Sequence, residues 1–277
     1  MKESQERSAG INPLQVVWRE AARGILRHPL LRTEGSVDDF GGLEKLCEYV
    51  GQGKGGIVVE MHFSTSDPLW AIDSITKNQA KSVKITAPIA KHQAFFGLLP
   101  FAKSIGVKAI KVVTPESKYR ADKKGENDLK RGEGTLQYLD EAAPTVRDGG
   151  IVVVASNATR KPKLTLDKDG VVTRLIKGLY DRGVSIEDSW IHFVAFEING
   201  LENYGDKKVR GLKLFKKYKV IHGETITLNE LLNRAKIDIK ENETRDKWRQ
   251  RNLQNIEEAV FSEQAKIAPK EYLGKEL

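Results

Sequence analysis

The sequence predicts an α/β fold in which helices flank a mostly parallel central sheet. Short apolar runs alternate with amphipathic segments along the chain. The clearest strand is the run of four β-branched residues at 151–154, which is typical of a strand buried on both faces. A length of 277 residues with 39% hydrophobic residues suits one large domain with helical extensions, or one domain and a small one. We expect an N-terminal amphipathic helical segment over 1–40, the main domain over 41–226 and a C-terminal helical extension over 227–277.

Periodicity and turn residues predict each element in turn. Apolar residues at steps of three and four predict an N-terminal amphipathic helix, with Leu14, Val17, Trp18, Ala21 and Ile25 on one face. Strands are predicted at Ile57–Met61, Val83–Ala87, Val107–Val113, Ile151–Val154, Trp190–Glu197 and Lys217–His222. Helices are predicted from Asp67 onward, over Phe95–Phe101, Leu129–Val146 and Val171–Tyr180, and in the polar region from about Glu241.

Composition narrows the class of partner and the compartment. The chain carries 46 Lys and Arg against 38 Asp and Glu, so its formal charge is +8. This favours an anionic partner, which could be nucleic acid, an acidic membrane surface or a phosphorylated small molecule. No apolar run approaches the roughly 18 residues of a membrane span, and the first ten residues do not resemble a secretory signal. The single cysteine, Cys47, indicates a reducing, cytoplasmic location.

The N-terminal helix has two interpretations. Trp18 beside a row of arginines (Arg19, Arg23 and Arg27) suits a helix that lies on anionic headgroups, so the protein would be peripheral and monotopic on a membrane. Alternatively, the helix packs against the domain and its arginines are only solvated. Nucleic acid is not expected as a partner, because no binding motif is present and aromatic residues are not interleaved with basic runs.

His62 and Asp67 form the strongest candidate for a catalytic pair. His62 directly follows a predicted strand, and ligands of α/β sheets collect beyond the carboxyl ends of strands. A carboxylate five residues later could orient the imidazole so that its other nitrogen accepts a proton from a hydroxyl. The alternative is structural: Asp67 before Pro68 would also cap a helix. No metal is implied, because the five histidines are dispersed without ligand spacing.

Three further segments follow the His-x4-Asp segment in a consistent order. They are Ala87-Pro-Ile-Ala-Lys91, Ala155-Ser-Asn-Ala-Thr-Arg160 after the valine-rich strand, and Val220-Ile-His-Gly-Glu-Thr-Ile226 at the end of a late strand. Together with residues 62–67 they resemble the signature blocks of the phospholipid/glycerol acyltransferase family. The resemblance covers about Gly55 to Ile226 and implies that family's acyltransferase domain and fold.

The resemblance implies roles for individual residues. His62 would be the catalytic base and Asp67 its orienting carboxylate. Arg160, Thr159, Asn157 and Lys91 would contact substrate, chiefly its phosphate. The third block departs from the family pattern, since Asn157 and Ala158 stand where the family has glutamate and glycine. This departure puts the acceptor in doubt more than the reaction.

The activity implied is transfer of a fatty acyl group from a thioester to a hydroxyl of a phosphorylated glycerolipid such as lysophosphatidic acid. The donor would be acyl-CoA or acyl carrier protein, each a co-substrate rather than a bound cofactor. Two alternatives stay open. One is a different acceptor, either glycerol 3-phosphate or another lysolipid. The other is a catalytically inactive homologue that only binds lipid.

Overall fold

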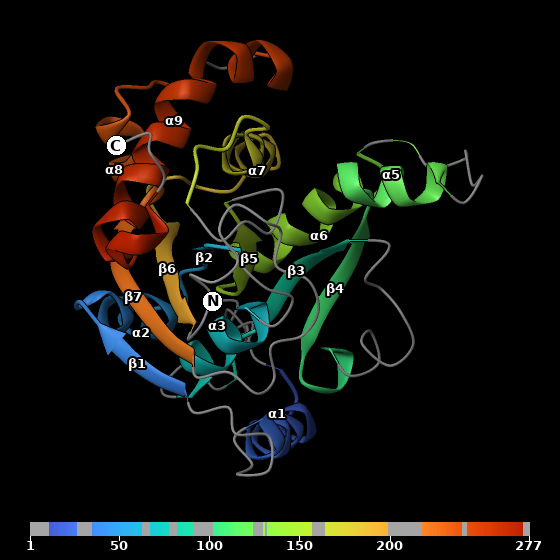
Figure 1. Cartoon of the computed structure of the whole chain (residues 1–277), viewed down its shortest axis with the longest axis vertical. Coiled ribbons are helices and arrows are strands. Elements are labelled where there is room, and N and C mark those ends of the chain that lie inside the picture. The colour runs from blue at the N-terminus through green and yellow to red at the C-terminus, as the bar shows by residue number, and fades with distance from the viewer. Residues whose placement is uncertain are drawn as a thin grey trace, which may run out of the picture.

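The computed structural model describes residues 11–26, 35–62, 67–77, 82–90, 102–123, 130, 132–156, 164–198, 218–239 and 243–273. Within these residues one sheet is formed by seven strands: β1 Gly35–Asp39, β2 Gly56–Glu60, β3 Ile85–Ala90, β4 Val107–Val112, β5 Ile151–Ala155, β6 Trp190–Ile198 and β7 Tyr218–Thr227. The strand order is β1-β7-β6-β2-β5-β3-β4 (Figure 1).

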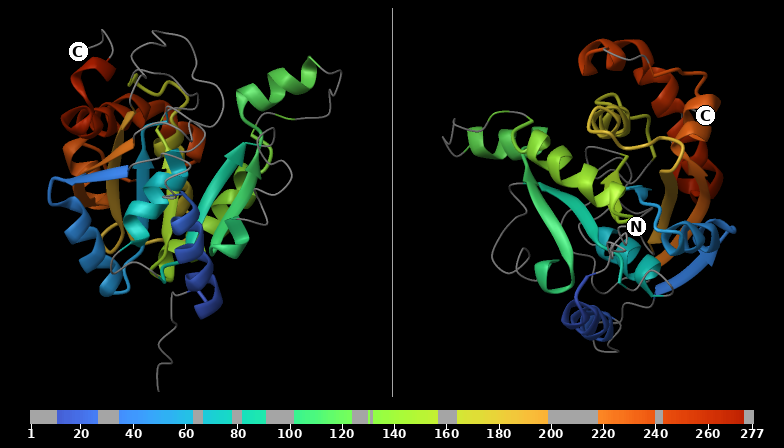
Figure 2. Two further views of the ribbon diagram at one scale, coloured as in Figure 1. Left: turned by 60° about the horizontal axis from the view of Figure 1, so that its bottom comes forward. Right: turned by 180° about the vertical axis from the view of Figure 1, so that it is seen from behind.

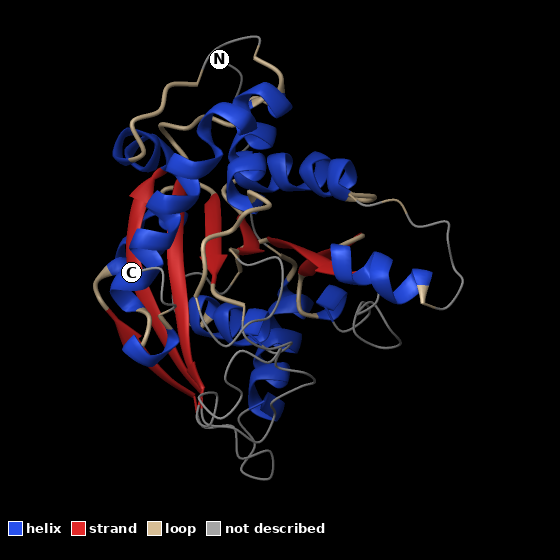
Figure 3. Ribbon diagram, turned by 45° about the horizontal axis from the view of Figure 1, so that its top comes forward, coloured by secondary structure: helices blue, strands red, loops and turns tan. Residues whose placement is uncertain are grey.

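Most neighbouring strands are parallel. Strand β2 lies between β5 and β6 and is parallel to both, while β3 is parallel to β4 and β5. Strand β7 is antiparallel to β6, and β1 is parallel to β7. All five residues of β2 are buried, as expected for a strand covered on both faces (Figure 3). The prediction of an α/β fold with a mostly parallel sheet is therefore confirmed.

Eight α-helices are described, and they are α1 Pro13–Leu26, α2 Gly42–Gly51, α3 Asp67–Thr76, α5 Pro115–Asp122, α6 Thr135–Arg147, α7 Val171–Tyr180, α8 Leu228–Arg234 and α9 Arg245–Ile267. Helices α1, α3, α6, α7 and α9 correspond to predicted helices. None of the described helices is long and apolar enough to cross a membrane. The helix predicted over Phe95–Phe101 lies outside the described residues.

The largest differences from the prediction concern three elements. Strand β1 lies within the segment 1–40 that we expected to be helical, and it pairs along its whole length with β7. Strand β7 continues to Thr227 instead of ending at His222, because its antiparallel pairing with β6 extends to Trp190 and Thr227. Helix α5 forms in a stretch too charged to be core. It begins after Thr114, whose side chain accepts a hydrogen bond from the Ser117 N–H, and it projects away from the sheet (Figure 2).

The C-terminal extension packs on the sheet through a helix face of mixed polarity. Helix α9 contacts α7, β6 and β7. Its buried residues include apolar Trp248, Ile256 and Val260, but also Glu257 and Gln264. We expected the apolar residues of this face but not the buried polar ones, because a core helix is usually identified by its apolar stripe alone.

Helix α1 is attached to the amino ends of β3 and β4 by a buried arginine. The Arg19 guanidinium donates hydrogen bonds to the backbone carbonyls of Val83 (2.9 Å), Gly106 (3.3 Å) and Ile105. The side chain is only 5% exposed. The predicted apolar face of α1 points outward instead, with exposed fractions of 64% at Leu14, 63% at Val17 and 51% at Trp18. The helix thus packs on the domain while its apolar stripe stays exposed.

Candidate functional site

His62 and Asp67 lie together at the carboxyl end of β2. The Met61 N–H donates to the Val194 carbonyl (3.0 Å), which keeps the chain on the sheet up to the residue before His62. Asp67 is the first residue of α3. The Nδ1 atom of His62 is 3.7 Å from Oδ2 of Asp67, and the side chains are 17% and 0% exposed respectively. The buried carboxylate therefore faces an imidazole that keeps partial access to solvent.

This geometry suits a carboxylate that orients a base. The 3.7 Å separation is an ion-pair distance and is longer than a hydrogen bond, as is common in catalytic sites without substrate. The first turn of α3 contributes a partial positive charge that favours an ionised Asp67. When a carboxylate faces Nδ1 of an imidazole, as Asp67 does here, Nε2 is the nitrogen that can exchange a proton.

Glu60 adds a second buried carboxyl that the sequence analysis did not identify. It ends β2 two residues before His62 and is 2% exposed. Burial, and secondly the charge of Asp67, raise the pKa of Glu60 well above its ordinary value. In the sequence, Glu60 is the one charged residue within the predicted strand Ile57–Met61, and this could have identified it.

Strand β5 ends beside Glu60, the last residue of β2. The backbone N–H of Ser156 donates to the Glu60 carbonyl (2.9 Å), and the Ser156 hydroxyl lies 3.3 Å from the same oxygen. Ser156 belongs to the block Ala155–Arg160, which also contains the predicted substrate-binding residues Asn157, Thr159 and Arg160. These three residues and Lys91 lie outside the described residues, so their predicted roles stay predictions.

Two of the dispersed histidines meet in the core, away from His62. His192 Nε2 is 2.8 Å from His222 Nδ1, and His192 Nδ1 is 2.7 Å from the Thr225 hydroxyl, which donates to the Gly42 carbonyl. Burial lowers the pKa of both rings, that of His222 to about 4. Because the antiparallel pairing of β6 with β7 joins them, sequence spacing gave no sign of the contact. In the described part of the chain, no group of three or more His, Cys, Asp or Glu residues could hold a metal.

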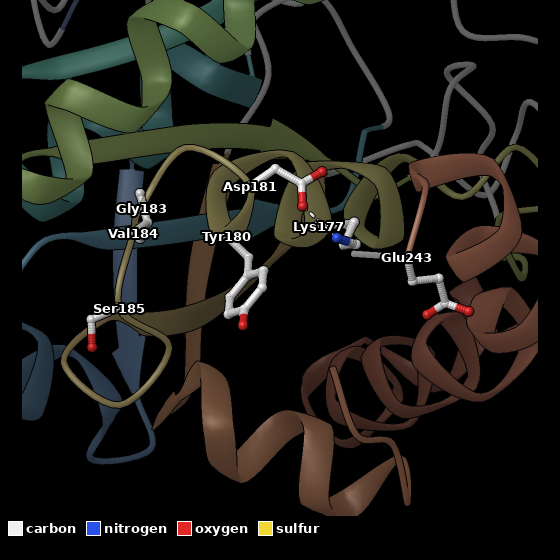
Figure 4. A pocket seen from close by; sticks show the side chains of 7 residues that line it. All are labelled: Lys177, Tyr180, Asp181, Gly183, Val184, Ser185 and Glu243. Carbon is white, nitrogen blue, oxygen red and sulfur yellow. Dashed lines mark hydrogen bonds and ion pairs between the residues drawn. The ribbon is translucent and has the colours of Figure 1, made fainter. Parts of the chain in front are cut away.

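An open hollow in the described surface lies away from the histidine–aspartate pair. It is an open depression of about 730 Å³ lined by Lys177, Tyr180, Asp181, Gly183, Val184, Ser185 and Glu243 (Figure 4). The end of α7 and the segment leading to β6 form much of it, which places it at the amino end of β6. Lys177 is already ion-paired with Asp181. A concave site is the usual first candidate for an active site, but here its groups are paired and it contains no histidine.

Comparison with known proteins adds no identification. A scan against protein-family models finds no match, and a search of curated proteins finds none.

Proposed function

We propose that the protein is an O-acyltransferase that uses His62 as a general base. The Nε2 atom of His62 would take the proton of an acceptor hydroxyl while the hydroxyl oxygen attacks the thioester carbonyl. Collapse of the tetrahedral intermediate would break the carbon–sulfur bond, and the imidazolium would return the proton to the leaving thiolate. The observation that carries this proposal is the contact of a partly exposed His62 with a fully buried Asp67.

The substrates follow from the resemblance to the phospholipid/glycerol acyltransferase family. The donor would be acyl-CoA or acyl carrier protein, and the acceptor a phosphorylated glycerolipid such as lysophosphatidic acid. Arg160 and Thr159 would bind the acceptor phosphate, with Asn157 and Lys91 as further contacts. The fold of that family agrees with the α/β sheet in its coarse features. We propose the assignment to this family because the four sequence blocks occur in the same order as in the family.

A panel of acyl donors and lysolipid acceptors, run on the wild type and His62→Ala together, tests the proposal. We expect the wild type to acylate at least one acceptor. His62→Ala should reduce the rate by about 10²–10⁴, the usual contribution of a general base. Circular dichroism and a thermal melt serve as controls, because His62 follows the strand and its loss should leave the fold intact. A wild type that transfers no acyl group to any glycerolipid would favour the inactive lipid-binding homologue.

We further propose that the protein sits peripherally on anionic membranes through α1. The exposed stripe of Leu14, Val17 and Trp18 and the net charge of +8 support this location. Flotation with anionic liposomes at low salt tests it. The double substitution Leu14→Ser with Trp18→Ser should abolish flotation, whereas Leu136→Ser, at a similarly exposed leucine of α6, should not. Equal flotation of all three proteins would contradict a seat at α1.

One observation favours the water-soluble acceptor among the alternatives. The stripe on α1 lies at the amino ends of β3 and β4, whereas His62 lies at the carboxyl end of the parallel strand β2. A five-residue strand separates the two ends by roughly 17 Å. A bilayer bound to α1 would therefore not contact His62. Glycerol 3-phosphate is water-soluble, so it could reach His62 from solution, whereas a lysolipid would first have to leave the membrane. The acceptor panel decides between them.

A further inference from the structure

A small, partly open cavity lies between the end of β5, the start of α7 and helix α9. Its volume is about 10 Å³, enough for one water molecule or one small ion. The residues that line it are Ser156, Thr165, Asp167, Glu257, Val260, Phe261 and Gln264. Four of the polar residues present oxygen atoms, and the fifth, Gln264, has an amide. The cavity uses none of the residues proposed for acyl transfer.

Two carboxylates of this cavity cap the amino end of α7. Asp167 accepts hydrogen bonds from the backbone N–H groups of Asp169 (2.9 Å) and Val171 (2.8 Å). Glu257 reaches across from α9 and accepts from the N–H of Thr173 (2.9 Å) and from its hydroxyl (2.6 Å). These contacts fix the positions of both carboxylates, and each oxygen that accepts one hydrogen bond still has a further lone pair.

Gln264 provides independent evidence that the cavity binds a ligand. Its side chain is fully buried and lines the cavity, and Nε2 is 3.5 Å from the Val59 carbonyl. Its Oε1 atom has no hydrogen-bond partner among the residues that the structure describes. A buried amide oxygen without a hydrogen-bond partner is destabilising, so such atoms are rare in folded proteins.

The negative charge of the two carboxylates is only partly balanced. Arg249 acts on Glu257 and Arg174 acts on Asp167, and each arginine favours the ionised form. An additional positive charge inside the cavity would stabilise both ionised groups.

We infer that the cavity is a binding site for one hard cation of about the size of Ca²⁺. Its ligands would be carboxylate oxygens of Asp167 and Glu257, the amide oxygen of Gln264, and hydroxyls of Ser156 or Thr165. Such an all-oxygen set, irregular and with a neutral amide, is typical of calcium sites. Mg²⁺ fits less well, because it retains several water molecules that a cavity of about 10 Å³ cannot hold. The bound ion would join α9 and the start of α7 to the end of β5.

Thermal unfolding of the chelator-treated full chain tests this inference without any activity assay. Calcium at about 100 times its dissociation constant should raise Tm by about 5–10 °C. Magnesium at the same concentration should raise Tm less. Isothermal titration with calcium chloride should give one ion per chain. A single water molecule is the competing occupant, and it would leave Tm independent of both ions.

Substitutions with matched controls on the same helix locate the effect. Gln264→Met keeps the volume of the side chain and removes the oxygen, and Glu257→Gln removes one charge. Both should abolish the calcium-dependent rise in Tm. The exposed neighbours Gln250→Met and Glu258→Gln should retain it. A wild-type Tm that does not respond to calcium, or a response that survives in both Gln264→Met and Glu257→Gln, overturns the site. A response to magnesium alone overturns the assignment to a calcium-sized ion.

Discussion

Two buried charged residues at opposite ends of the strands differ in their surroundings. At the amino ends of β3 and β4, Arg19 is bonded to three backbone carbonyls. At the carboxyl end of β2, Glu60 keeps its Oε2 atom without a hydrogen-bond partner among the described residues, close to the charge of Asp67. A charge with all its contacts satisfied serves to hold elements together. A buried carboxyl with a raised pKa beside a histidine–aspartate pair instead marks a place where protons can be exchanged.

The largest effect should come from the carboxyl end, through Asp67→Asn. The amide cannot stabilise an imidazolium, so we expect acyl transfer to fall by about 10²–10⁴ while the fold survives. Initial rates at saturating donor measure this. Asp73→Asn is the matched control, because Asp73 is also buried in α3. Equal losses in the two variants would mean that α3 needs its carboxylates for folding and not for catalysis.

The next effect should come from the amino end, through Arg19→Met. Methionine retains an apolar stem but donates no hydrogen bonds to the carbonyls of Val83, Ile105 and Gly106. The free energy of unfolding should fall by about 2–4 kcal/mol, measured by urea denaturation. The acyl-transfer rate per folded molecule should stay unchanged. Arg147→Met, at an exposed arginine ending α6, should change stability by less than about 0.5 kcal/mol. A drop in rate without a drop in stability would show that α1 reaches the site.

A smaller and pH-dependent effect is expected for Glu257→Gln in the presence of a chelator. The pKa of Glu257 is about 7 in the folded protein, above its ordinary value. The stability that this carboxyl contributes is therefore complete at low pH and is lost as the pH rises through about 7. A glutamine side chain does not titrate. The free energy of unfolding of the variant should therefore rise relative to that of the wild type by about 2–3 kcal/mol between pH 5 and pH 8.

The comparison must use the difference between variant and wild type at each pH. Burial lowers the pKa of His192 and His222, so their contribution has the opposite sign and is lost as the pH falls below about 6.5. Subtraction removes this histidine contribution, which both proteins share. Glu258→Gln, at an exposed neighbour, should give a difference that does not vary with pH. If the stability difference between Glu257→Gln and the wild type is also independent of pH, Glu257 does not have a raised pKa in the folded protein.

Local patterns were sufficient for six of the seven described strands and for the proximity of His62 to Asp67. The valine-rich run at 151–154 and the His-x4-Asp spacing depend only on neighbours along the chain, and the contact of His62 with Asp67 agrees with the expected pair. Strand β1 could not be predicted in the same way. Its sequence, Gly-Ser-Val-Asp-Asp, has one apolar residue, and it becomes a strand only because β7 offers it a parallel partner.

Contacts between distant segments were beyond the reach of periodicity. His192 and His222 meet through an antiparallel register that no spacing encodes. Glu257 and Gln264 are seven residues apart and lie on one face of α9. Because both are polar, a search for apolar periodicity does not identify them as buried. The exposed stripe of α1 is the opposite case. Its apolar periodicity was predicted correctly, but the residue that attaches the helix is the charged Arg19, and periodicity cannot tell which face is bound.

The outer strands of the sheet show how its growth is stopped. Strand β1 is short and ends in Asp38 and Asp39, while β4 carries Lys108 and Lys111 at solvent-accessible positions. Another chain that added a strand at either side would have to strip water from these charges. The sheet therefore ends in two charged borders that discourage edge-to-edge association and keep its open backbone groups from seeding aggregates.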